Sequence, residues 1–112
     1  MEPHKITHEF IGKVPCIYIE GDMTSEADDA IMSLYTKIKS ENPPSHIVFN
    51  FSKTSYINSA GIATLINVIQ DMNDNSGKVS FVGLSNHFLK VMDIVGISDF
   101  VDIHETNQQA LK

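Results

Sequence analysis

The pattern of apolar and polar positions predicts alternating strands and helices along most of the chain. Alternation predicts strands over residues 6–10 and 14–20, and Gly12-Lys13 between them favours a hairpin turn. This first pair of strands is therefore expected to be antiparallel. Short apolar runs bounded by turn residues predict three more strands, over residues 46–51, 79–83 and 100–103.

Helical spacing of apolar residues fills the stretches between these strands. One helix is predicted from Ser25, with Asp28 as its capping partner, to the stop at Asn42-Pro43-Pro44. A second helix is predicted after a cap at Asn58, with residues 59–61 in its first turn, and a third is expected from a cap at Asn86 to Gly96. The second helix has its apolar stripe at Ile62, Leu65, Ile66, Ile69 and Met72. Residues 52–55 are read as a polar loop, and residues 105–111 as a last helical turn or two.

This order of elements predicts an α/β fold. Strands that alternate with helices form a mostly parallel sheet, here of four to five strands with an N-terminal antiparallel strand and about four helices. The chain has 112 residues, of which 42% are hydrophobic, enough for one core, so residues 1–112 are expected to form a single domain.

Composition bears on the cellular compartment in which this domain is expected. No run approaches the ~20 apolar residues that span a bilayer, and the first residues are polar, unlike a secretory signal. Cys16, the single cysteine, cannot form an intramolecular disulfide and lies in an apolar run, which is typical of a small buried side chain. We therefore expect a cytoplasmic protein without direct membrane insertion.

The charge of the chain argues against nucleic acid. There are 8 Lys plus Arg against 14 Asp plus Glu, a net charge of −6, and the basic residues form no cluster. An acidic surface fits a basic protein partner, and it equally fits solubility alone. The histidines lack metal-ligand spacing, and the chain has neither a Gly-x-Ser-x-Gly motif nor a phosphate-binding glycine loop. We expect no metal, no cofactor and no enzymatic activity.

The segment over residues 56–62 carries the most specific candidate chemistry. Asn58 is a favoured helix N-cap, so Ser59 is expected in the first turn, where small Ala60 and Gly61 leave it open to approach. A phosphate on Ser59 would meet unpaired backbone N–H groups at the positive end of the helix dipole. The plainer interpretation is that Asn58 and Ser59 are capping residues only.

Several segments together resemble the STAS domain family, in particular the bacterial anti-sigma factor antagonists. The resemblance covers nearly all of the chain and rests on residues 21–24, 46–51, 56–62, 81–84 and 91–97. It implies that Ser59, which precedes a small residue and a glycine, matches the family's regulatory phosphorylation site.

The resemblance also implies a partner-switching cycle. The unphosphorylated protein would bind an anti-sigma factor that is also a serine kinase, the kinase would end the contact by phosphorylating Ser59, and a PP2C-type phosphatase would reverse it. The protein is expected to be monomeric, with Met23 and Ile62 as exposed apolar contacts. The expected partner-binding residues are Asp22, Met23, Thr24, Asn58, Ser59, Ala60, Gly61 and Ile62.

Two positions depart from the family pattern. Asn58 stands where the family often has Asp, and Thr24 stands at another position where Asp is frequent. Both departures remove negative charge near Ser59. They leave open an alternative, a phosphorylation-independent STAS scaffold or subunit, for instance in a lipid-transport complex.

Overall fold

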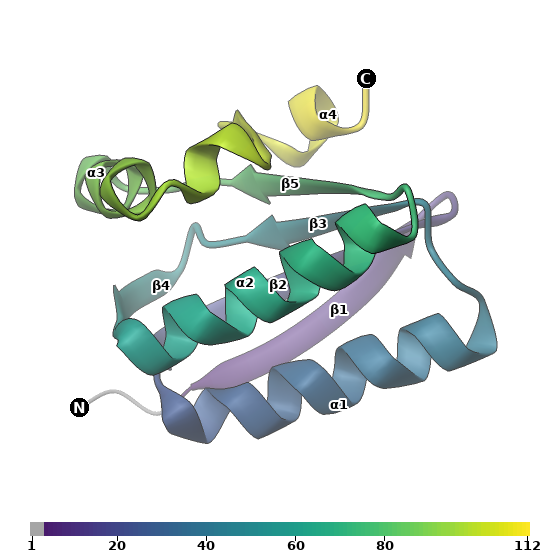
Figure 1. Ribbon diagram of the computed structural model, residues 1–112, viewed down its shortest axis with the longest axis horizontal. Coiled ribbons are helices and arrows are strands. Elements are labelled where there is room, and N and C mark those ends of the chain that lie inside the picture. Colours follow the sequence, from purple (N-terminus) through teal and green to yellow (C-terminus); the bar gives the residue numbers. More distant parts are fainter. Residues whose placement is uncertain (1–3) are drawn as a thin grey trace.

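The computed structural model describes residues 4–112, in which strands and helices alternate after a first hairpin (Figure 1). The strands are β1 (Lys5–Ile11), β2 (Val14–Met23), β3 (His46–Asn50), β4 (Thr54–Ile57), β5 (Lys78–Val82) and β6 (Asp102–His104). The helices are α1 (Ser25–Glu41), α2 (Ser59–Asp74), α3 (Asn86–Val95) and α4 (Asn107–Ala110), with a 3-10 turn η1 (Ile97–Asp99).

The strands of the described chain form one sheet with a mostly parallel arrangement. Its order is β1-β2-β3-β5-β6, and β4 pairs with β2 off this path. The β1–β2 pair is antiparallel, and the other pairs are parallel. The predicted α/β fold class, with its N-terminal antiparallel strand and four helices, is confirmed. β4 is a strand that the sequence pattern did not predict.

The main hydrophobic core lies between the sheet and helices α1 and α2, which run along the same face (Figure 1). Its centre is a trio of fully or almost fully buried rings, Phe49, Phe51 and Phe81, with Phe51 and Phe81 5.1 Å apart in an edge-to-face contact. The opposite face has a smaller core, in which α4 covers the strands. That second core consists of Cys16, Val48, Val82 and Ala110.

Several observed boundaries differ from the predicted ones. β2 does not stop at Gly21 but continues to Met23 through a register shift at Gly21/Asp22. The N-caps are Thr24, without a side-chain cap bond, and Ser85, not Ser25 and Asn86. The last strand begins at Asp102, because residues 97–99 take up a 3-10 turn after α3.

Candidate functional site

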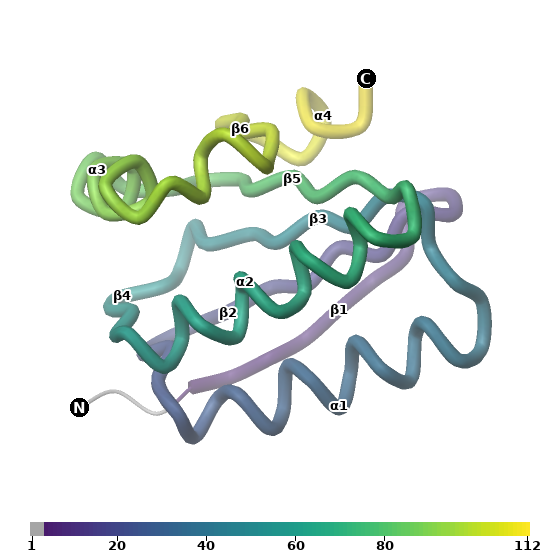
Figure 2. The backbone as a smooth tube through the Cα atoms, in the orientation of Figure 1, coloured from purple at the N-terminus to yellow at the C-terminus, as the bar shows by residue number. Residues whose placement is uncertain are grey.

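Pairing of β4 with the end of β2 brings two distant parts of the chain together. Asp22 lies opposite Tyr56 and Met23 opposite Ile57, and the Asn58 N–H donates to the Met23 carbonyl at 3.2 Å. β4 then runs directly into the first turn of α2 (Figure 2). The candidate residues at positions 22–24 and 58–62 therefore lie side by side, as a consequence of a strand that local sequence did not reveal.

Asn58 caps helix α2 and places Ser59 at its first position. The Asn58 side-chain oxygen accepts from the Gly61 N–H at 3.0 Å, and its backbone carbonyl accepts from the Ile62 N–H at 3.0 Å. The amides of Ser59 and Ala60 lie outside the helix's own hydrogen-bond ladder. Ser59 is exposed, and the first turn of α2 contains no acidic residue. This end of the helix is thus suited to accept negative charge.

Gly61 packs against the end of β2, where there is no room for a side chain. It is buried, and a Cβ at this position would lie 2.6 Å from the Met23 carbonyl oxygen and 2.9 Å from Ile57 Cγ1. The close approach of helix and strand therefore requires glycine. Sequence reasoning assigned its small size to access for a partner, whereas its contacts lie inside the molecule.

The remaining candidate residues differ in exposure. The expectation that Met23 is exposed is wrong, because its side chain is fully buried under α2. Asp22 and Thr24 are also buried, while Ala60 and Ile62 are half-buried. Any partner that reaches this region therefore meets α2 and not the side chain of Met23.

Tyr56 is an exposed aromatic residue that sequence reasoning left without a role. It is 53% exposed on β4, two residues before the helix cap. The exposure of Tyr56 could have been predicted from the apolar Ile57 next to it. Neighbouring side chains in a strand point to opposite faces, so burial of Ile57 leaves Tyr56 facing outward. We define the Ser59 surface as Tyr56, Asn58, Ser59, Ala60 and Ile62.

One acidic side chain reaches α2 from α1. The Thr64 hydroxyl donates to the Asp28 carboxylate and lies 3.1 Å from the Ala60 carbonyl oxygen. Thr64 is buried, so this contact ties the two helices together close to the start of α2. Glu26 and Asp29, acids of the same turn region, are exposed. The Asp28 carboxylate therefore lies against the second turn of α2, at Thr64.

Other candidate chemistry finds little support in the described part of the chain. Within residues 4–112, no group of three or more His, Cys, Asp or Glu is placed to hold a metal ion, and no helix is long and apolar enough to cross a membrane. Burial, and then the nearby Glu9 charge, raise the pKa of the Cys16 thiol to about 11, so this thiol stays protonated at neutral pH.

Several solved structures share this fold. The Bacillus cell fate determinant SpoIIAA in its phosphorylated form matches with a TM-score of 0.79 at 17% identity, covering 96% of each chain. An anti-sigma factor antagonist from Mycobacterium paratuberculosis has a TM-score of 0.84 at 15% identity, covering 97% of this chain and 92% of its own. A sulfate transporter family protein from Wolinella succinogenes has a TM-score of 0.80 at 14% identity, covering 92% and 86%.

The sequence itself matches a family. The model of the STAS domain matches residues 5–110, which is nearly all of the chain and every strand and helix described above. The chain therefore belongs to the STAS domain family.

Proposed function

We propose that this protein is an anti-sigma factor antagonist that is switched by reversible phosphorylation of Ser59. The observation that carries the proposal is the position of Ser59: an exposed hydroxyl at the first residue of a capped helix whose first turn holds no acid. In this proposal the protein is the substrate of a kinase and a phosphatase, and it is not itself an enzyme.

A phosphate at this position changes the surface without unfolding the helix. It adds roughly −1.5 to −2 charges and three acceptor oxygens, next to the amides of Ser59 and Ala60. The helix dipole stabilises that charge, so the fold is retained. A partner seated on the Ser59 surface loses its contact, because it would have to accommodate a dianion in a desolvated interface.

The proposed partners follow from this cycle. An anti-sigma factor that is also a serine kinase binds the unphosphorylated protein and transfers a phosphoryl group from ATP to Ser59, and a PP2C-type phosphatase removes it. The net charge of −6 supports a partner with a basic contact surface and not a nucleic acid. The protein acts in the cytoplasm, as a monomer, through the Ser59 surface, which the buried residues 22–24 support from below.

The comparisons support this proposal at the level of fold. SpoIIAA has been solved in both an unphosphorylated and a phosphorylated form, and both have the fold of this chain. A STAS fold of this kind therefore accommodates phosphorylation in at least one other protein. The chain shares 14% and 17% identity with those two forms, so the assignment of Ser59 rests on its own geometry.

A second function is favoured by particular residues. Asn58 and Thr24 are neutral where the family pattern often has Asp, and one similar structure belongs to a sulfate transporter family protein. These observations fit a STAS module that binds its partner constitutively, for instance as a subunit of a lipid-transport complex. In that case the partner stays bound whatever the state of Ser59.

The deciding experiment is intact mass analysis of the protein purified from its native cells, with fragmentation to locate any phosphate. Ser25 provides a matched control, because it is also an exposed serine at the first position of a helix, but its first turn contains Glu26 and Asp28. We expect one phosphate that is lost in Ser59→Ala and retained in Ser25→Ala. Absence of phosphate on Ser59 under several growth conditions would favour the constitutive module.

A further inference from the structure

Exposed apolar side chains gather around the end of α3. Ile94 is 84% exposed, Val95 45% and Phe100 67%, although all three lie within a stretch of only a few residues. The chain turns between α3 and η1, where Gly96 takes a left-handed conformation with φ of 89°. A cluster of exposed apolar groups on a small domain marks an interaction surface.

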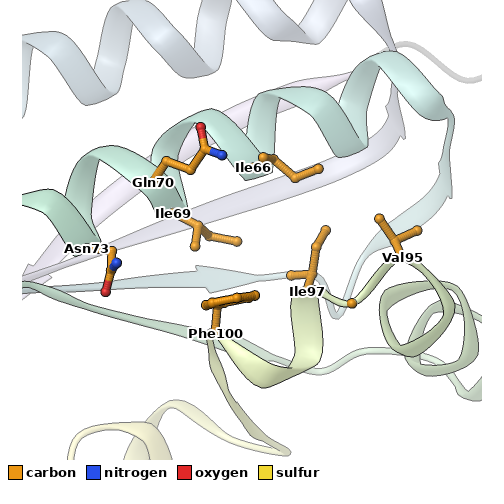
Figure 3. A pocket seen from close by; sticks show the side chains of 8 residues that line it. Ile66, Ile69, Gln70, Asn73, Val95, Ile97 and Phe100 are labelled. Atoms are coloured by element: carbon orange, nitrogen blue, oxygen red, sulfur yellow. The ribbon is translucent and has the colours of Figure 1, made fainter.

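A groove lies beside these side chains, between α2 and the α3–η1 turn (Figure 3). Its floor is formed by Ile69 and Ile97, which are 7% and 4% exposed, and Ile66, Val95 and Phe100 form its apolar walls. Its volume is about 230 Å³. Small-molecule pockets usually have about 300–1,000 Å³, while a cavity of ~150 Å³ holds a benzene ring. The groove therefore suits one or two apolar side chains of a partner.

The elements around the groove select the kind of segment that fits. Its lining residues belong to α2, to the end of α3 and to the η1 turn, and none belongs to a strand. Addition of a β-strand requires a free strand edge, which this groove does not offer. An amphipathic helix can place its apolar face between α2 and the α3–η1 turn without such an edge. A helix is therefore the partner segment that suits this groove.

Charge around the groove selects the partner further. α2 contains no lysine or arginine, and neither do residues 91–104; Lys90 of α3 directly precedes this stretch, and Lys39 of α1 is paired with Asp71 of α2. Asp74 is four residues beyond the lining residue Gln70 and so lies on the same side of α2, and the Asp93 carboxylate accepts from the hydroxyl of Ser98, next to Ile97, at 3.2 Å. A second copy of the chain would bring the same acids against these, which is unfavourable. A segment with lysine or arginine beside its apolar face is complementary.

We propose that this groove is a second docking site, which binds one cationic amphipathic helix of another protein. Ile69 is ten residues beyond Ser59 on α2, which corresponds to about 15 Å along the helix. The floor of the groove therefore lies well beyond Ser59, but its wall residue Ile66 is one helical turn from Ile62 of the Ser59 surface, so the two surfaces adjoin along α2. This inference goes beyond the proposed function and does not depend on phosphorylation.

The test uses the intact protein and a labelled synthetic peptide of about 15 residues made of leucine and lysine, with leucines at helical positions i, i+3, i+4 and i+7. Fluorescence anisotropy gives the affinity, and methyl NMR locates the contact. We expect saturable binding, with shifts at the methyl groups of Ile66, Ile69 and Ile97. A peptide of the same composition with leucines distributed around the helix should bind about tenfold more weakly.

Two matched substitutions separate the groove from general charge attraction. Phe100→Ser should weaken binding of the peptide about tenfold, since it removes one wall of the groove. Phe10→Ser, at a 53% exposed phenylalanine on β1, should change the affinity less than about twofold. Because both side chains are more than half exposed, neither change is expected to unfold the protein.

Four results would overturn the proposal: equal binding of the two peptides, equal binding by Phe100→Ser and the parent protein, no saturable binding up to about 1 mM peptide, or a dimer in light scattering that is lost in Phe100→Ser. The last result would assign the groove to a second copy of the chain. None of these results bears on phosphorylation of Ser59, which the mass analysis decides separately.

Discussion

The two ends of helix α2 are built from different contacts. At its start, Gly61 packs directly on the Met23 carbonyl, and Asn58 caps the first turn through hydrogen bonds. Towards its end, Ile69 forms the floor of an open apolar groove, and Asp71 is held by the Lys39 ammonium at 2.7 Å. The start of α2 is held mainly by contacts to backbone atoms and by the small Gly61, whereas contacts near its end are made by larger side chains.

This difference has consequences for what each end can do. Backbone contacts at the start of α2 leave no room for adjustment, so added charge there changes the surface of a fixed structure. Side chains around the groove can change rotamer and adapt to a partner. A single helix thus presents a rigid polar position and an adaptable apolar one, and the substitutions below test that contrast.

The largest expected effect is a loss of binding affinity caused by a substitution at the start of α2. Ser59→Asp places a negative charge on the Ser59 surface and should weaken binding to the cognate kinase about 100-fold, or about 2.7 kcal/mol. Isothermal titration calorimetry measures this loss. Ser33→Asp, at an exposed serine of α1, serves as the control and should bind normally. Unchanged affinity of Ser59→Asp would support the constitutive module.

The next largest effect is on the free energy of unfolding, compared for substitutions of two glycines near the two ends of α2. Gly61→Ala should lower the free energy of unfolding by about 2 kcal/mol, because its Cβ would lie 2.6 Å from a backbone carbonyl, which outweighs the helix propensity of alanine. Gly77→Ala should cost less, about 1 kcal/mol, since its Cβ would lie 2.7 Å from Met72 Cε, the end of a flexible side chain, and no closer than 3.1 Å to the Met72 carbonyl oxygen. Urea unfolding measures both, and equal costs would contradict the contrast.

A smaller effect is expected from the cap. Asn58→Ala should lower the free energy of unfolding by about 1 kcal/mol, because the Gly61 N–H loses its acceptor. Asn58→Asp should raise it by about 0.3–1 kcal/mol, since it keeps the acceptor and adds charge at the helix start. Ser85→Ala removes the equivalent cap of α3 and provides the reference loss. If Asn58→Ala unfolds like the parent protein, the cap has no energetic role.

The smallest effect concerns pH at the other end of α2. The hydrogen bond from Lys39, and next the one from Tyr35, lower the pKa of Asp71 below its ordinary value of 3.8. The folded pKa is therefore below the unfolded one, and the stabilisation is present above pH 3.8 and is lost as pH falls through the folded pKa. Since both partners are more than one third exposed, we expect only about 0.5 kcal/mol.

Asp71→Asn tests this pH dependence. Its cost in the free energy of unfolding should be measurable near neutral pH and smaller in acid, where the carboxylate of the parent protein is protonated. Urea unfolding at pH 7 and in acid gives both values. Asp74→Asn, at an exposed acid of the same helix, is the control. A cost that grows in acid would reverse the sign and contradict the assignment.

Much of the fold follows from local patterns in the sequence. The apolar stripe of α2 predicted the burial of Leu65, Ile69 and Met72 but not that of Val68, and Asn58 predicted the start of the helix, because helix period and capping depend on residues within a few positions of one another. The position of Ser59 at an exposed helix start is confirmed for the same reason. The pairing of the first two strands also follows from a local turn at Gly12-Lys13.

Other features arise only from contacts between distant residues. β4 has a polar sequence and becomes a strand because the end of β2 offers an unpaired edge: the Gly21 N–H donates to the Lys53 carbonyl, and the Thr54 hydroxyl donates to the Ile19 carbonyl. The burial of Met23 follows from that pairing and from Gly61 above it.

The sequence by itself therefore determined the order of most elements, the family resemblance and the serine at a helix start. Tertiary structure alone decided which residues surround that serine and which part of the α2 stripe stays open as a groove. The physical reason is range: periodicity and caps act over a few residues, whereas burial at positions 22–23 depends on residues 54–61. Likewise, the groove depends on where Gly96 sends the chain after α3.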